Sequence, residues 1–149
     1  MMEGRLHGLE HQLSLRVYYE DTDAAGVVYH ASYLRFAERG RCEFLRTLGV
    51  AQGTLRRDHG LIFAVARVEL DYLAPIRLDD RIELHTRLDT LGRASLSTFQ
   101  QFWVNGTLCA ELIARIVALS TESGRPLRLP HGLRHLIAPF CGDGPLSVE

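Results

Sequence analysis

Residues 17–34, VYYEDTDAAGVVYHASYL, join an alternating strand pattern to the start of an amphipathic helix through an acidic turn that contains a glycine. Apolar and polar residues alternate from 13 to 20, which predicts a half-buried strand. From Ser32 to Leu48 the apolar residues recur at helical spacing, and Gly49 stands where a C-terminal cap is expected. The stretch therefore predicts a strand, a tight turn and the one long helix of the chain.

Four further strands are predicted after this helix. A short second helix near residues 52–58 connects to apolar, β-branched runs at 61–73, 81–91, 94–104 and 108–119. Asn105-Gly106 is a strong hairpin signal and Gly92 marks a second tight turn, so the last three strands should form an antiparallel meander. The fold class is therefore predicted as α+β, with the helix buried against a five-stranded antiparallel sheet.

Length and composition indicate one domain. With 149 residues and 46% hydrophobic composition, the chain can bury a substantial core. We expect a flexible N-terminal segment at 1–12, the domain at 13–137 and a flexible C-terminal tail at 138–149, where glycine and proline accumulate.

Charge and cysteine content limit the partners and the compartment. The formal net charge of -1 argues against a nucleic-acid surface, which usually needs a basic excess. Three widely spaced cysteines offer neither a disulfide framework nor a CxxC motif, which favours a cytoplasmic location. No window approaches the ~18 consecutive apolar residues of a membrane span.

Asp23 is the first candidate for a reactive carboxylate. It lies in the turn before the helix, beside the small residues Ala24, Ala25 and Gly26. Unpaired N–H groups and the helix dipole concentrate positive potential at a helix start. A carbonyl can become an oxyanion there beside an attacking carboxylate. The alternative is that Asp21 or Asp23 only shapes an Asx turn or caps the helix.

The helix entrance supplies further candidates. Tyr29 and His30 lie there, and the backbone N–H groups of residues 28–31 are the natural oxyanion donors. The His30 ring could act directly or be an ordinary, partly exposed histidine, and Tyr29 could simply pack under the turn. Ser32 could contact substrate, although a hydroxyl in this position is most often an N-cap.

Other chemistries lack their motifs. The chain contains no G-x-S-x-G elbow, G-x-G-x-x-G loop or Walker pattern. Cys42 and Cys109 fall in a predicted helix and strand, where buried, inert thiols are usual. The seven histidines are scattered without HExxH or Cys/His ligand spacing, so we predict no metal and no redox cofactor.

The long segment VYYEDTDAAGVVYHASYLRFAERGRCEFL resembles the hotdog-fold acyl-CoA thioesterases of the 4-hydroxybenzoyl-CoA thioesterase-like family, and most of all the Tol-Pal-system-associated members. The similarity continues through LDYLAPIRLDDRIELHTRL and LGRASL to RPLRLP, from about Leu15 to Leu133. Relatives often carry glycine within Ala24-Ala25, and aromatic residues where this chain has Ala37 and Leu73, which leaves the acyl preference open.

The resemblance implies a five-stranded sheet wrapped around one long helix, and dimers that often pair into tetramers. It also implies active sites between two subunits, with coenzyme A phosphates held by basic residues at the rim. By the same resemblance, Asp23 is the catalytic carboxylate and the His30 amide polarises the thioester carbonyl. Gly26, Val28 and Tyr29 fall on the matching turn.

The predicted function is therefore hydrolysis of an acyl- or aroyl-CoA thioester, with Asp23 as nucleophile or general base. The predicted catalytic residues are Asp23, Tyr29 and His30, and the predicted substrate-binding residues are Gly26, Val28 and Ser32. The expected partners are acyl-CoA, with acyl carrier protein as a further candidate, and a second copy of the chain. Two alternatives stay open: a non-catalytic acyl-CoA-binding or protein-binding module, and a hydratase or dehydratase that uses Asp23 and His30 as an acid/base pair.

Overall fold

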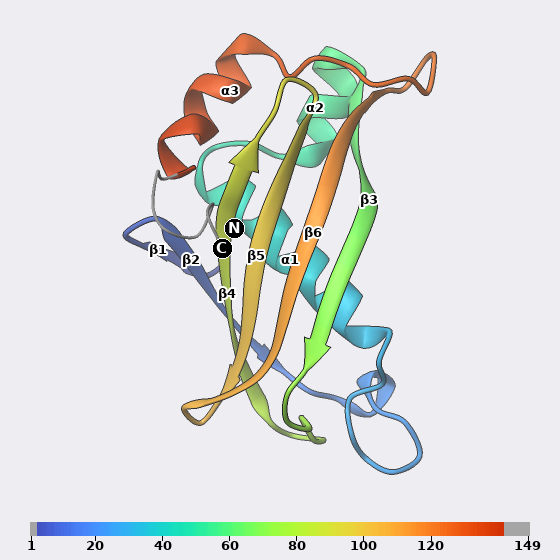
Figure 1. Ribbon diagram of the computed structural model, residues 1–149, viewed down its shortest axis with the longest axis vertical. Coiled ribbons are helices and arrows are strands. Elements are labelled where there is room, and N and C mark those ends of the chain that lie inside the picture. The colour runs from blue at the N-terminus through green and yellow to red at the C-terminus, as the bar shows by residue number, and fades with distance from the viewer. Residues whose placement is uncertain (1–2, 142–149) are drawn as a thin grey trace.

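The alternating segments form one six-stranded antiparallel sheet in the computed structural model, which describes residues 3–141 (Figure 1). The strand order is β1-β2-β4-β5-β6-β3, which leaves β1 and β3 at the two edges. The strands are β1 (Arg5–His7), β2 (Glu10–Arg16), β3 (Leu61–Tyr72), β4 (Arg81–Leu91), β5 (Ser95–Val104) and β6 (Thr107–Ser120).

Helices lie on one side of this sheet. The long helix α1 (Ser32–Thr47) crosses behind the strands, while α2 (Gln52–His59) and α3 (His131–Ile137) lie near one end (Figure 1). Two 3₁₀ turns, η1 (Tyr19–Asp21) and η2 (Ala138–Phe140), complete the elements. The apolar stripe of α1 is buried as its spacing predicts, through Tyr33, Phe36, Ala37, Gly40 and Phe44.

The predicted meander is confirmed. Strands β4, β5 and β6 are consecutive neighbours in the sheet, and Val104 pairs with Thr107 across the last turn. Asn105 and Gly106 have φ angles of 49° and 80°, the left-handed pair that a type I′ hairpin turn requires. The hairpin signal in the sequence therefore identified the turn correctly.

Among residues 3–141 the sheet has six strands where five were expected. The short second helix expected near residues 52–58 is confirmed as α2, and a third α-helix, α3, follows the last strand. Residues 5–7 and 10–12, expected in a flexible segment, form β1 and the start of β2. These strands could not be predicted from the sequence, because β1 is too short to show alternation and because β2 points a polar residue inward. That residue, His11, is fully buried and its Nε2 lies 3.1 Å from the Glu3 carbonyl oxygen.

Two further segments differ from their expected structure, at the end of the first predicted strand and after residue 137. Tyr19, expected in a strand, lies in η1, where the side chain of Asp21 accepts a hydrogen bond from the backbone N–H of Tyr18. At the other end η2 extends past residue 137, and Phe140 packs edge-on against Phe44 with 5.8 Å between ring centroids. Residues 142–149 of the expected tail lie outside the described residues.

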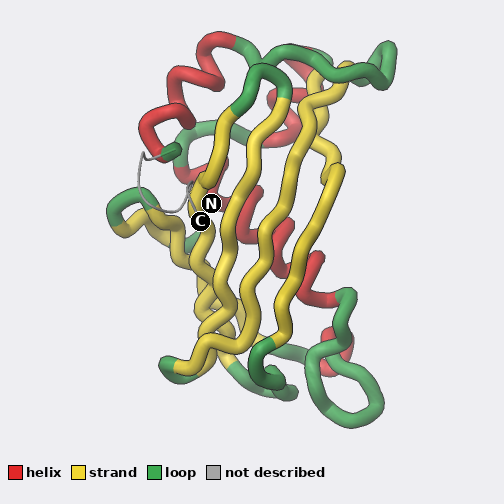
Figure 2. Tube along the Cα trace, in the orientation of Figure 1, coloured by secondary structure: helices red, strands yellow, loops and turns green. Residues whose placement is uncertain are grey.

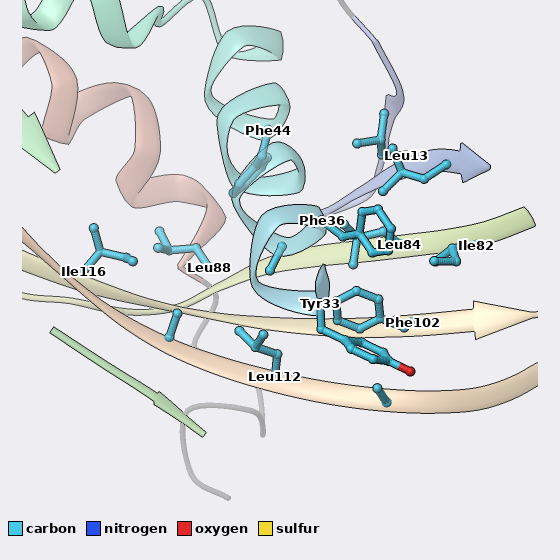
Figure 3. Packing of buried hydrophobic residues seen from close by; sticks show 14 of the residues in the cluster. Leu13, Tyr33, Phe36, Phe44, Ile82, Leu84, Leu88, Phe102, Leu112 and Ile116 are labelled. Atoms are coloured by element: carbon cyan, nitrogen blue, oxygen red, sulfur yellow. The ribbon is translucent and has the colours of Figure 1, made fainter. Parts of the chain in front are cut away.

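The helix α1 packs very close to the sheet at Gly40. A Cβ atom built on Gly40 would lie 2.7 Å from Leu84 Cδ2 and 2.8 Å from Gln100 Nε2. The buried Gln100 amide fixes this approach, because its Nε2 donates to the Ala37 carbonyl oxygen and to Thr86 Oγ1, both at 2.9 Å. Around it the core is apolar, and Figure 3 shows Tyr33, Phe36, Leu84 and Phe102 meeting between helix and strands.

Substitution of Gly40 by alanine should destabilise the fold. We expect Gly40→Ala to lower the free energy of unfolding by about 1–2 kcal/mol, because overpacking outweighs the gain of about 1 kcal/mol in helix propensity. Gly53, on α2, has no atom within 4 Å of a built Cβ, so Gly53→Ala should raise stability by up to about 1 kcal/mol. Urea denaturation measures the free energy of unfolding of both variants. Equal stabilisation by the two substitutions would contradict the close packing at Gly40.

Candidate active site

The loop between β2 and α1 is fastened to the segment between β3 and β4. Val17 donates from its backbone N–H to the Asp80 carbonyl, and its own carbonyl accepts from the Asp79 N–H. Further along the loop, the Gly26 carbonyl accepts from the Leu78 N–H. The Val28 N–H donates to the Ile76 carbonyl at 2.7 Å. Both connections lie at the end of the sheet where β3 finishes, beside the start of α1 (Figure 2). The acidic turn is therefore held by main-chain contacts to a segment about fifty residues away.

Asp23 closes its own turn. Its backbone carbonyl accepts from Gly26 N at 3.0 Å, and its Oδ1 accepts from Ala25 N at 2.9 Å and from Val27 N at 3.4 Å. Gly26 has a φ of 79°, which a residue with a side chain rarely adopts. Within residues 3–141, Oδ2 of Asp23 has no hydrogen-bond donor, and the side chain is exposed. One carboxylate oxygen thus shapes the turn while the other stays open to a ligand.

Asp21 has a different role from Asp23. Its side chain is buried, its Oδ2 accepts from Tyr18 N at 2.8 Å, and its Oδ1 lies 3.7 Å from Arg35 Nη2. Its backbone carbonyl accepts from Tyr29 N at 2.9 Å. Asp21 therefore braces η1 and the helix entrance from inside, as the turn-forming alternative in the sequence proposes.

The backbone at the helix entrance leaves donors free beside His30. The N–H groups of Val28 and Tyr29 are used, whereas those of His30 and Ala31 have no acceptor within the described part of the chain. The carbonyl of the Tyr29–His30 peptide accepts from Ser32 N at 2.8 Å, which polarises the His30 N–H further. Together with the dipole of α1, this arrangement favours a negatively charged group beside the His30 N–H.

Asp23 and His30 border the same open hollow, of about 440 Å³. The rest of its lining is apolar or aromatic and comes from Val27, Val28, Tyr33, Tyr72, Leu73, Ala74, Pro75 and Ile76. An apolar hollow with a few polar groups on one side is the usual form of a small-molecule site.

Two tyrosines connect this hollow to the core. The ring of Tyr33 meets those of Tyr72 and Phe102 edge-on, at centroid distances of 5.2 and 5.3 Å. Burial raises the pKa of Tyr33 to about 12, with smaller contributions from Cys109 and Tyr72, so its hydroxyl stays protonated. Tyr72 donates from its hydroxyl to the His30 carbonyl oxygen at 3.3 Å, which ties the end of β3 to the helix entrance.

Of the other predicted site residues, Val28 lines the hollow, whereas Tyr29, Ser32 and Gly26 lie outside its lining. Tyr29 is exposed and its ring lies against that of His30, at 4.3 Å between centroids. Ser32 is buried and its Oγ accepts from Arg35 Nη2 at 2.8 Å, so it is neither an N-cap hydroxyl nor part of the hollow's lining. Gly26 shapes the turn, whereas Val28 is a buried residue of the wall.

Comparisons with known proteins identify the family of the chain. A family model described as the Thioesterase-like superfamily matches residues 17–137. The chain belongs to this family. It is 41% identical over 128 residues to "Acyl-CoA thioester hydrolase YbgC" of Escherichia coli O6:H1, covering 85% of this chain and 92% of the relative.

Two solved structures support the fold. A probable thioesterase from Bartonella henselae is 36% identical with a TM-score of 0.78, over 81% of this chain and 99% of that one. A thioesterase from Thermus thermophilus, solved with coenzyme A and Zn, is 32% identical with a TM-score of 0.75, over 89% of this chain and 95% of that one. The expected hotdog thioesterase family is confirmed, and with it a thioester hydrolase.

Sequence reasoning missed Tyr72 and residues 74–76 as walls of the hollow, whereas the resemblance had already linked Leu73 to the acyl preference. The Ala74-Pro75 break signals only that β3 ends, and nothing local shows that the chain then turns back toward Asp23. The helical spacing places Tyr33 in the apolar stripe of the helix. Its burial confirms that prediction, although its ring also faces the hollow.

Neither a metal cluster nor a membrane span is present within residues 3–141. No group of three or more histidine, cysteine, aspartate or glutamate side chains there could hold a metal ion. Nor does that part of the chain contain a helix that is long and apolar enough to cross a membrane.

Removal of the Asp21 side chain should destabilise the fold. Asp21→Ala leaves the Tyr18 N–H without its charged acceptor, so we expect the free energy of unfolding to fall by about 1.5–3 kcal/mol. Asp58 is the control, because it is exposed and pairs with Arg57 at 3.2 Å, and Asp58→Ala should cost at most about 1 kcal/mol. Chemical denaturation tests this ranking, and equal costs would rule out the bracing role.

Proposed function

We propose that the chain hydrolyses the thioester of an acyl- or aroyl-CoA to a carboxylate and free coenzyme A, with Asp23 as the reacting carboxylate. The observation that carries this proposal is the hollow that Asp23 and His30 both border. Among the described residues, Oδ2 of Asp23 has no hydrogen-bond donor and the backbone N–H of His30 has no acceptor. The E. coli relative is named as an acyl-CoA thioester hydrolase, and the Thermus protein was solved with coenzyme A, which supports the substrate class.

Two routes use the same groups. In the first, Asp23 attacks the thioester carbon, the C–S bond breaks, the thiol of coenzyme A leaves, and water hydrolyses the mixed anhydride. In the second, Asp23 accepts a proton from a water molecule as that water attacks the carbon, and the same thiol leaves. Both pass through a negatively charged oxygen, which the His30 N–H stabilises.

Asp23→Asn should remove activity without removing the fold. An asparagine Oδ1 can still accept from Ala25 N and Val27 N, so the turn is retained while the negative charge is lost. We expect kcat to fall by about 10²- to 10⁴-fold. Release of free thiol from a panel of acyl-CoA and aroyl-CoA esters measures this, with acyl carrier protein thioesters included. A folded variant within about tenfold of the wild-type rate would reject both routes.

The His30 ring and the His30 amide make different predictions. If the backbone N–H is the oxyanion donor, His30→Ala keeps it, and we expect kcat to fall by no more than about tenfold. A hydratase or dehydratase that uses the ring as its acid or base would lose about 10²- to 10⁴-fold. The same thiol-release assay, with a parallel assay of hydration of an enoyl-CoA, separates the two.

The wild-type protein also tests the binding-module alternative. A protein that binds a non-hydrolysable acyl-CoA analogue, yet releases no thiol across the whole panel, would be a binding module instead of an enzyme.

A second copy of the chain is part of the proposal. Strand β3 lies at the sheet edge, with its remaining N–H and C=O groups unpaired along twelve residues. Tyr72 and Leu73, which line the hollow, are both 54% exposed, and Val65 on the same edge is 50% exposed. A dimer, or a dimer of dimers, that covers this edge would close the open side of each hollow.

A further inference from the structure

A second, more enclosed cavity lies between the later turns of α1 and the sheet. We call it the distal cavity. Its volume is about 80 Å³, more than two water molecules occupy in the liquid at about 30 Å³ each. Side chains of α2, α3 and four strands complete its walls, and Figure 3 shows two of them, Leu88 and Ile116, pointing from the sheet toward the helices. Its polar lining consists of Glu38, Arg41, Cys42, Gln52 and Thr98.

Among the described residues, one of these polar groups, Thr98, is buried without a hydrogen-bond partner, and a second, Arg41, is partly buried without a close carboxylate. Thr98 is 3% exposed, and its hydroxyl oxygen has no hydrogen-bond partner within residues 3–141. Arg41 donates from Nη1 to Gln100 Oε1 at 3.1 Å, but it has no carboxylate within 4 Å among the described residues. Burial also lowers the pKa of Arg41, which reflects incomplete compensation of its charge. Buried polar groups without partners are rare, and they suggest an unseen ligand atom.

A groove of about 230 Å³ adjoins the distal cavity along α1. It runs between Leu34, Glu38 and Arg41 of α1 and Val65, Val68 and Leu112 of the sheet. It shares Glu38, Arg41 and Val65 with the distal cavity, while Leu34 directly follows Tyr33 of the hollow. From Tyr33 to Cys42 the helix rises about 13 Å at about 1.5 Å per residue, which matches the reach of about ten extended methylene groups.

We propose that the groove holds the acyl chain of the substrate and that the distal cavity binds a hydroxyl group near the far end of that chain. The proposal rests on the proposed function and names the substrate class as a medium-length, terminally hydroxylated acyl-CoA. The polar side chains of the lining fit a hydroxyl group better than other chain ends. A hydroxyl oxygen can accept a hydrogen bond from Arg41 or Thr98, and the hydroxyl hydrogen can be donated to the carboxylate of Glu38. A terminal carboxylate would face Glu38, and a methyl terminus would leave Thr98 unpaired.

The test compares decanoyl-CoA with 10-hydroxydecanoyl-CoA. For the wild-type protein we expect kcat/KM to be about tenfold higher for the hydroxylated substrate, the effect of one added hydrogen bond. Thr98→Val keeps the shape but removes the hydroxyl, so this ratio should fall toward one. Because the hydroxyl has no partner in the described part of the protein, the variant should melt no lower than wild type. A wild-type ratio at or below one, or an unchanged ratio in Thr98→Val, overturns the proposal.

The matched control is Thr54→Val. Thr54 is an exposed residue of α2 outside the distal cavity, so the change should leave both rates and their ratio unchanged. Thr98 is preferred to Arg41 as the tested position, because Arg41 also holds Gln100 and its removal could disturb packing of α1.

Failure of the proposed function can be told apart from failure of this inference. If neither ester releases thiol while other esters of the panel do, the inference fails and the hydrolytic proposal stands. If no ester of the panel releases thiol, the hydrolytic proposal fails, and calorimetry with decanoate and 10-hydroxydecanoate decides the distal site alone. Tighter binding of the hydroxylated acid to wild type, lost in Thr98→Val, would support the distal site. Equal binding of the two acids, or no binding of either, would overturn it.

Discussion

The close approach of α1 to the sheet is the constraint on which the rest of the structure depends. Gly40 has no side chain at the contact, and Gln100 bridges the helix and strand β4 from the buried face. Because the helix is rigid, fixing it at its middle also fixes where its N-terminus ends up, beside the last residues of β3. The free amide of His30 and the apolar walls of the hollow are brought together by packing that occurs ten residues away.

The acidic turn shows how two nearby carboxylates can differ in role through burial alone. Asp21 is turned inward and satisfied by the backbone N–H of Tyr18, with Arg35 close by, while Asp23 is turned outward and keeps one oxygen unpaired within the described residues. Both stand in a loop that the segment 76–80 holds through main-chain hydrogen bonds. The different roles of Asp21 and Asp23 therefore follow from the geometry of the loop, because the two residues are of the same type.

Much of this is predictable from local patterns, and the failures have physical reasons. The helix at Ser32 and the Asn105-Gly106 hairpin follow from short-range rules, since spacing and φ preference act within a few residues. Strand β1 escapes prediction because three residues carry no periodicity, and the inward-facing His11 breaks the pattern of β2. Tyr72 reaches the helix entrance only through the tertiary fold, so no window of sequence could place it there.

The turn around Asp23 has a further consequence because the carboxylate is a structural member of its own loop. Its Oδ1 contacts hold the backbone in shape before any substrate arrives, so binding need not supply the free energy of ordering the loop. The open Oδ2, which is the reacting oxygen in the proposed mechanism, is thereby preorganised by Oδ1 of the same side chain. Glutamate, which has the same charge on a longer stem, would lose that self-alignment, and chemical similarity is therefore a poor guide to exchange at this position.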